Sequence, residues 1–246
     1  MSYNNNYYAN TSNHNGGFAM KNNKFDNLDV NNSAPRCPVI LLLDTSSSMA
    51  GMPINELNAG LRQFIEEASQ DEAASMSVEL EIITFDDSAT IVQPFTPMSD
   101  FTSVPTLYAN GMTYMGAALQ LANSELTKRR QLYQRNGIPA YKPWVILMTD
   151  GGPNDYWQKA AAEMRHRGEN GEIMYIGLEI GGQADHQTMC QIMPLNSPPQ
   201  QLSCVKFKSF FKWVTDSLKV VTRSAVSAQD AIRLPNPQSW LDFSGM

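Results

Sequence analysis

Residues 38–51 read PVILLLDTSSSMAG, and the fold class is inferred first from this segment. Its five aliphatic residues, Val39 to Leu43, follow a proline and stop at Asp44. A continuous apolar run of this length, bounded by proline and hydroxyl residues, predicts a strand that is buried on both faces, as in a parallel sheet. Four hydroxyl residues, Thr45 to Ser48, come directly after the aspartate. A carboxylate and several alcohols are therefore expected where this strand ends.

A second apolar run has the same pattern. Residues 144–148 read WVILM, and the polar turn TDGGPND follows at residues 149–155. Apolar runs of this kind alternate along the chain with segments of helical periodicity, which predicts a parallel sheet covered by helices on both faces. The expected fold class is α/β, a doubly wound, mostly parallel central sheet in a three-layer, Rossmann-like α/β/α arrangement. The pattern predicts strands at 39–43, 78–85, 89–92, 144–148 and 173–178, and helices at 54–68, 115–126, 157–167 and 209–221.

Composition divides the chain into three parts. Residues 1–34 are rich in Asn and nearly free of aliphatic side chains, so we expect a disordered N-terminal tail. Residues 35–226 are expected to form one folded domain. Proline and serine become frequent after it, and we expect residues 227–246 to be a C-terminal tail that lies loosely on the surface.

Charge and cysteine content exclude several classes of partner. The net charge is −6, and no basic cluster is larger than Lys128-Arg129-Arg130, so nucleic acid is not an expected partner. The apolar runs are too short to span a membrane. Three cysteines without a C-x-x-C pattern favour a reducing compartment. Because the N-terminal residues also lack the pattern of a signal peptide, the expected location is cytoplasmic.

Enzymatic alternatives fit the strand ends less well. No G-x-S-x-G frame surrounds the serines, and none of the three histidines, His14, His166 and His186, is expected to follow a core strand as a general base would. Neither of the glycine-rich phosphate-binding patterns is present. An aspartate-dependent phosphatase that uses Asp44 as its nucleophile stays open, although Ser46 stands where a second carboxylate would be expected.

A divalent cation suits the same residues better. Hydroxyl and carboxylate oxygens are the hard ligands that Mg²⁺ prefers, whereas zinc or softer metals favour Cys and His. The carboxyl ends of neighbouring parallel strands lie at one edge of the sheet. The hydroxyl residues after Asp44, the Asp150-Gly151 pair, and Thr113 in the loop before a predicted helix would each, taken alone, also be typical of a helix cap or a turn. Together, they predict a metal site built from Asp44, Ser46, Ser48, Thr113 and Asp150.

The combination resembles the von Willebrand factor type A domain and its metal-ion-dependent adhesion site. The D-x-S-x-S element of that family matches Asp44, Ser46 and Ser48, and its T-D-G element matches residues 149–151. Its threonine element, G-x-T-x-x-G-x-A-L, matches residues 111–119. The resemblance extends from about Pro38 to Val221.

The resemblance implies a non-enzymatic protein-binding module. A bound Mg²⁺, with Mn²⁺ or Ca²⁺ as alternatives, would be completed by a Glu or Asp of a partner protein. The segments PVILLLDTSSSMAG, ITFDDSA, VILMTDGGPND and FKSFFKWV resemble the bacterial tellurium-resistance (TerY-like) branch. The resemblance to that branch implies a role in stress response or phage defence. It also implies that a kinase and a phosphatase are encoded nearby.

One residue departs from the family pattern. Ser47 occupies a position at which family members usually have glycine, a residue that tolerates positive φ. We therefore expect a loop of slightly different shape, or one that does not need that freedom. A domain that keeps the fold only as a scaffold, without metal, is the further alternative.

Overall fold

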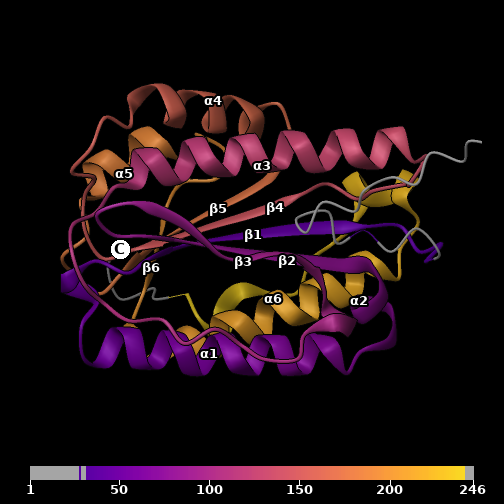
Figure 1. The fold of residues 1–246 in the computed structure, drawn as a ribbon, viewed down its shortest axis with the longest axis horizontal. Coiled ribbons are helices and arrows are strands. Elements are labelled where there is room, and N and C mark those ends of the chain that lie inside the picture. Colours follow the sequence, from indigo (N-terminus) through magenta and orange to yellow (C-terminus); the bar gives the residue numbers. More distant parts are fainter. Residues whose placement is uncertain (1–27, 29–31, 242–246) are drawn as a thin grey trace, which may run out of the picture.

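A six-stranded sheet forms the centre of the protein in the computed structural model, which describes residue 28 and residues 32–241 (Figure 1). The strand order is β3-β2-β1-β4-β5-β6, and every neighbouring pair is parallel except β2 and β3. The strands are β1 (Cys37–Asp44), β2 (Val78–Phe85), β3 (Ala89–Pro97), β4 (Trp144–Thr149), β5 (Met174–Ile180) and β6 (Gln200–Leu202).

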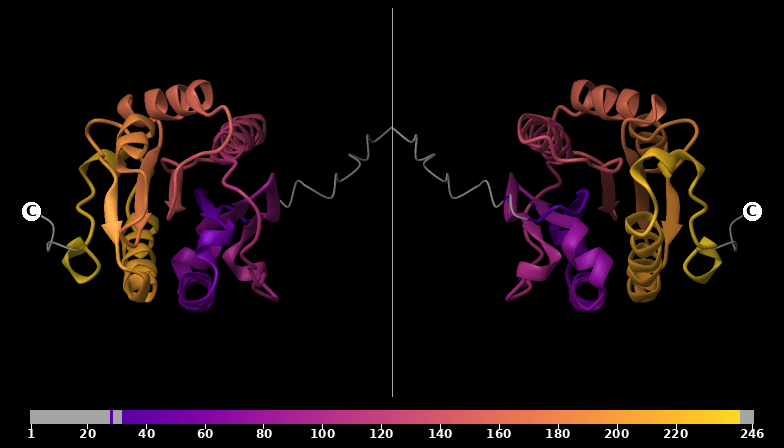
Figure 2. Two further views of the ribbon diagram at one scale, coloured as in Figure 1. Left: turned by 90° about the vertical axis from the view of Figure 1, so that its left-hand side faces the viewer. Right: turned by 90° about the vertical axis from the view of Figure 1, so that its right-hand side faces the viewer.

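Helices cover both faces of the sheet, which confirms the predicted three-layer α/β/α fold (Figures 1 and 2). One layer contains α1 (Met52–Ser69), α2 (Glu72–Ser77) and α6 (Phe207–Thr222), and the other contains α3 (Met115–Arg135), α4 (Gln158–Glu169) and α5 (His186–Ile192). Among the described residues, no helix is long and apolar enough to cross a bilayer.

The central strand β1 explains why both layers are needed. Val39, Leu41 and Leu43 belong to the hydrophobic core on the side of α1 and α6, whereas Ile40 and Leu42 belong to the core on the side of α3 and α4. Side chains alternate between the two faces of a strand, so a run that is apolar throughout needs cover on both faces. The sequence pattern and the layered architecture therefore agree.

Several elements differ from the sequence expectation. The strand predicted at residues 89–92 is longer than expected, because β3 extends to Pro97 along the edge of β2. Three short elements were not expected: α2, α5 and β6. With six, seven and three residues they are too short for a reliable periodicity. The expected disorder of the Asn-rich tail concerns residues that lie outside the described part, except residues 28 and 32–34.

The segment after α6 packs more closely than expected for a loose tail. Trp240 is only 3% exposed, and its ring lies against those of Phe210 and Trp213. The indole N–H of Trp213 also donates a hydrogen bond to the carbonyl of Pro235, at 2.9 Å. One large aromatic side chain is enough to hold a proline-rich segment on the core, which an average over composition does not reveal.

A cluster of buried charged side chains connects β2 with α3 near the amino end of β2. The Glu79 carboxylate on β2 is paired with Arg36 at 3.2 Å and with Arg129 at 2.7 Å, and it accepts a hydrogen bond from the Tyr133 hydroxyl. All three charged side chains are at most 4% exposed. Removing one partner of such a cluster would leave an uncompensated buried charge, which is strongly destabilising.

Glu81, two residues further along β2, has a poorer environment. Its Oε1 atom is buried without a hydrogen-bond partner among the described residues. Burial, assisted by the negative charge of Glu125, raises the pKa of the Glu81 carboxyl to about 8 from its ordinary value of 4.5. The folded protein therefore favours the protonated form of this side chain.

We expect this carboxyl to make folding pH-dependent. Between pH 4.5 and about 8 the folded state binds a proton that the unfolded state has released, so the free energy of unfolding falls as pH rises through this window. Glu81→Gln should remove this pH dependence. The variant's free energy of unfolding should therefore exceed that of wild type by an amount that grows with pH, to about a few kcal/mol at pH 8. Urea titrations at several pH values measure it, with the exposed Glu66→Gln as control. A difference between Glu81→Gln and wild type that does not change with pH would contradict the assignment.

Candidate metal site at the strand ends

The parallel pairing of β1 with β4 brings the two polar strand ends together. Leu43 lies opposite Met148, so the residues that follow each of them are adjacent. The Thr149 hydroxyl donates a hydrogen bond to Asp44 Oδ2 at 2.6 Å, and the Ser46 backbone N–H donates to Asp44 Oδ1 at 2.8 Å. Both carboxylate oxygens of Asp44 are thus held by neutral donors.

Burial sets the electrostatics of Asp44. The residue has no exposed surface, and burial raises the pKa of its carboxyl to about 6, although the hydrogen bonds from Ser46 and Thr149 oppose this shift. The nearby Asp150 raises the pKa slightly further. A buried carboxylate beside a second carboxylate is an environment that a cation would stabilise.

The serine side chains continue from Asp44 toward solvent. Ser46 Oγ lies 3.0 Å from Ser48 Oγ, and the Ser48 hydroxyl donates to Asp150 Oδ1 at 2.7 Å. Ser46 is buried, Ser48 is exposed and Asp150 is half-buried. Neighbouring oxygens around an octahedral Mg²⁺ with ligands at 2.0–2.1 Å are roughly 2.9 Å apart. The oxygens of these three side chains therefore have a spacing that fits such an ion, and they open to solvent on one side.

Thr113 comes from the loop before α3. Its backbone N–H donates to Asn154 Oδ1, and its carbonyl accepts from the Asn154 N–H, both at 2.9 Å. Its Oγ1 atom lies 3.9 Å from the position that a Cβ would occupy on Gly151, the residue after Asp150. The structure thus brings all five residues predicted from the sequence to one edge of the sheet.

Two glycines allow the Thr113 loop to adopt this position. Gly111 has φ +74°, and a Cβ there would lie 2.8 Å from the Asp87 carboxyl group. A Cβ on Gly116 would lie 2.6 Å from the Tyr156 carbonyl oxygen, so α3 approaches this backbone too closely for any side chain. Asp155 then accepts hydrogen bonds from the N–H groups of Gly116 and Ala117, at 2.9 and 2.8 Å. This carboxylate anchors the first turn of α3.

Ser47 does not strain the loop. It begins a short 3₁₀ turn, Ser47–Met49, and its N–H donates to the Gly111 carbonyl at 3.1 Å. Among residues 32–241 only glycines have positive φ, so the position occupied by Ser47 needs no left-handed conformation. Of the two expectations for this departure from the family pattern, the structure favours the one in which special freedom is not required.

Sequence reasoning missed three supporting residues. Thr149 orients Asp44, Asn154 holds the Thr113 backbone, and Asp155 anchors α3. Thr149 ends β4 and belongs to the T-D-G element, whereas Asn154 and Asp155 belong to the polar turn after it, so these positions in the sequence were the available signal. The expectation that no histidine follows a core strand was wrong for His186, which begins α5 shortly after β5 and whose Nδ1 is 2.8 Å from Glu179 on β5.

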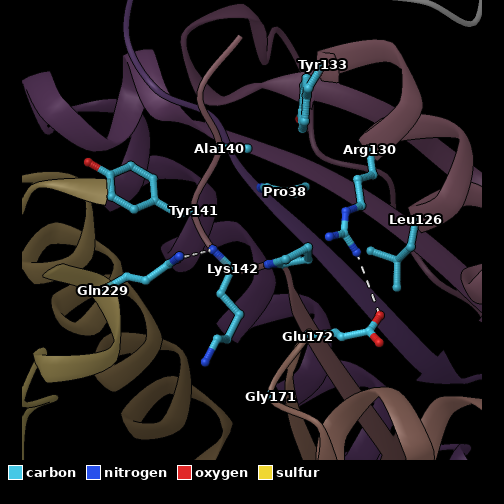
Figure 3. Close-up of a pocket in the computed structure, with 11 residues that line it drawn as sticks. Pro38, Leu126, Arg130, Tyr133, Ala140, Tyr141, Lys142, Gly171, Glu172 and Gln229 are labelled. Atoms are coloured by element: carbon cyan, nitrogen blue, oxygen red, sulfur yellow. Dashed lines mark hydrogen bonds and ion pairs between the residues drawn. The ribbon is translucent and has the colours of Figure 1, made fainter. Parts of the chain in front are cut away.

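A cavity lies away from these residues. A cavity of about 220 Å³ opens near the amino ends of β1 and β4, beside Pro38, Tyr133 and Lys142 (Figure 3). Among the residues that line it, the Lys142 backbone N–H donates a hydrogen bond to Gln229 Oε1 at 2.6 Å. The candidate metal residues lie at the opposite, carboxyl ends of these strands, so this cavity is not part of their site. Within the described residues, no three His, Cys, Asp or Glu side chains gather to form a metal site of their own.

Comparison with known proteins identifies a family for this chain. The sequence profile of the von Willebrand factor type A domain matches residues 39–218. Among curated proteins, no similar sequence was found.

Similar folds occur in solved structures of much longer chains. The open conformation of the pilus adhesin SpaC from Lactobacillus rhamnosus GG has a TM-score of 0.59 at 15% identity, over 76% of this chain and 30% of that one. Proximal thread matrix protein 1 from the mussel byssus, with a zinc-occupied MIDAS motif, has a TM-score of 0.52 at 18% identity. That match covers 74% of this chain and 48% of the mussel protein, so the chain spans about half the length of this relative. The match of the family profile over most of the folded residues shows that the chain belongs to the von Willebrand factor type A domain family.

Proposed function

We propose that this protein is a non-enzymatic, metal-dependent protein-binding module. Asp44, Ser46, Ser48, Thr113 and Asp150 would hold one divalent cation, which would attract an anionic oxygen from a Glu or Asp of a partner. The continuous contact from Ser46 through Ser48 to Asp150, with the buried Asp44 behind it, carries this proposal. Domains of this family are generally interaction modules, often with a metal at this position.

The donor set favours Mg²⁺, with Mn²⁺ or Ca²⁺ as alternatives. Three hydroxyls and two carboxylates supply only hard oxygen ligands, and no imidazole or thiolate is among them. The two carboxylates balance the +2 charge of a divalent ion without exceeding it. A further anionic oxygen would therefore still bind the ion favourably. The zinc in the mussel protein supports occupancy by a divalent cation at the matching motif, and zinc therefore belongs in the test.

The surroundings of the site support a protein as the partner. An exposed large apolar side chain follows or accompanies each of the three ligand-bearing segments: Met52, at the start of α1, is 59% exposed, Met112 is 50% exposed and Tyr156 is 79% exposed. Exposed apolar and aromatic side chains near one polar centre are typical of interaction surfaces. An acidic residue of the partner would thus be flanked by apolar contacts.

The geometry of Asp44 argues against an aspartate-dependent phosphatase. A nucleophilic carboxylate must present an oxygen to phosphorus, yet Asp44 is fully buried and both of its oxygens accept hydrogen bonds. The residue two positions further is Ser46, which cannot act as a general acid in the way that a second carboxylic acid would.

The resemblance of four sequence segments supports a narrower proposal for the biological setting. We propose a role in a bacterial stress-response, tellurium-resistance or phage-defence assembly, with a kinase or phosphatase encoded nearby among the candidate partners. A cytoplasmic location suits the three cysteines, which are all free. Neither nucleic acid nor a membrane is a proposed partner.

Calorimetry tests the metal site directly. We expect Mg²⁺ and Mn²⁺ to bind wild type with measurable heat, and we expect Asp44→Ala and Ser48→Ala to lose it, because each variant removes an oxygen ligand. Ser99→Ala, an exposed serine on another loop, is the matched control and should bind as wild type. Zn²⁺ and Ca²⁺ titrations rank the ions. Equal and negligible heats for wild type and both site variants would favour a scaffold without metal.

Asn154 should control affinity without touching the ion. Asn154→Ala removes the acceptor that holds the Thr113 N–H, so the loop loses its position, and the dissociation constant for Mg²⁺ should rise about 10- to 100-fold, as for other groups that orient ligands. Asn154→Asp keeps an acceptor oxygen and should recover most of the loss. Unchanged affinity in Asn154→Ala would show that the Asn154 side chain does not position Thr113 for the ion.

Chelation should release the partner. Tagged wild-type protein incubated with an extract of its source cells in Mg²⁺ should retain a partner that EDTA elutes, because metal and partner binding are thermodynamically coupled. Ser48→Ala should retain less of it, and Ser99→Ala should retain as much as wild type. A partner that stays bound in EDTA and on Ser48→Ala would place the interaction surface elsewhere.

A further inference from the structure

Three reactive side chains form a connected series on β5 and α5. Glu179 lies near the carboxyl end of β5, and His186 and Cys190 lie one turn apart on α5. His186 Nδ1 is 2.8 Å from Glu179 Oε1, and His186 Nε2 is 3.4 Å from Cys190 Sγ. The imidazole therefore links a carboxylate to a thiol. None of these residues contributes a ligand to the proposed metal site.

The carboxylate fixes the tautomer of His186. An ionised carboxylate only accepts hydrogen bonds, so the proton of the neutral imidazole lies on Nδ1, and Nε2 presents its lone pair to the Cys190 thiol. In this tautomer, Nε2 can accept the thiol proton. A base oriented by a third group beside a nucleophile is the arrangement that activates cysteine.

Glu179 is itself held rigidly. Its side chain has no exposed surface, and its second oxygen, Oε2, accepts a hydrogen bond from the side-chain amide of Gln201 on the neighbouring strand β6. A buried carboxylate with both oxygens engaged cannot turn away from His186. It would also stabilise the imidazolium that forms when His186 accepts a proton.

The thiol is accessible, whereas the other two cysteines are less so. Cys190 is exposed, Cys204 is partly buried and Cys37 is fully buried. Burial raises the pKa of Cys37 to about 12 and also raises the pKa of Cys204. Both therefore favour the unreactive thiol form.

We propose that Cys190 is a nucleophilic thiol, activated by His186 and positioned through Glu179, that forms mixed disulfides with low-molecular-weight disulfides. Nε2 of His186 takes the Cys190 proton, and the thiolate attacks one sulfur of the disulfide. A bond forms between Cys190 Sγ and that sulfur as the original disulfide bond breaks. The departing thiolate takes the proton from His186 and leaves as a thiol, so one thiol is oxidised and one sulfur of the reagent is reduced.

Site-resolved thiol chemistry on the full chain tests the proposal. Wild type is treated with iodoacetamide, and separately with oxidised glutathione, at neutral pH, and the modification rate of each cysteine is followed by peptide mass spectrometry. The key variant is His186→Gln, whose side-chain amide can still donate to Glu179 but cannot accept the thiol proton. Because His186 is 65% exposed, this substitution should leave the fold intact, which circular dichroism checks.

We expect Cys190 to react faster than Cys204 and Cys37 with both reagents. His186→Gln should slow the Cys190 reaction about three- to tenfold, in line with the loss of thiolate. The ultraviolet thiolate absorbance that Cys190→Ser removes from wild type should be absent in His186→Gln. Glu179→Gln should slow the reaction as well. It should also weaken the thiolate absorbance of Cys190, which a merely structural role of Glu179 would leave unchanged. Equal Cys190 rates in wild type and folded His186→Gln, or faster modification of Cys204, would overturn the proposal.

Discussion

The parallel register between β1 and β4 is the constraint on which the candidate metal site depends. It places the ends of the two most apolar strands beside each other, so that Thr149 reaches Asp44 and Asp150 reaches Ser48. The register is specified strongly because both strands are buried on both faces, and a shift of one residue would turn every side chain to the opposite layer. Core packing therefore determines the geometry of the polar edge, and the core residues Met49 and Met115 donate backbone hydrogen bonds to the carbonyls of Ser46 and Thr113.

The two ends of the sheet handle polar groups differently. Near the amino end of β2, Glu79 is enclosed by Arg36, Arg129 and Tyr133, so its charge is neutralised within the protein. At the carboxyl ends of β1 and β4, the hydrogen bonds that two carboxylates accept from the described residues come from neutral hydroxyl and amide donors. The first arrangement stabilises the fold by compensating a buried charge. The second leaves an excess of negative charge at a solvent-open edge, which is the electrostatic basis for proposing a cation there.

The loops at this edge of the sheet also contact α5, the helix that carries His186 and Cys190. A Cβ on Gly152, two residues after Asp150, would lie 3.0 Å from the Asp185 side chain that begins α5. The loop after β4 thus packs directly against the helix that carries His186 and Cys190. A parallel sheet gathers loops from several strands at one edge, and two chemically different sites can therefore be close neighbours without sharing a residue.

The layered fold and the five candidate ligands could be predicted from the sequence, because continuous apolar runs and the D-x-S-x-S, threonine and T-D-G elements are local patterns. The tertiary structure decided which residues support them: Asn154 and Asp155 are 41 and 39 residues away from the Thr113 and Gly116 backbone groups that they hold. The same holds for Trp240, whose burial depends on aromatic rings of α6, and for His186, whose partner Glu179 is seven residues earlier on a strand. Such contacts follow from the packing of separate elements, so no local pattern of residue types could predict them.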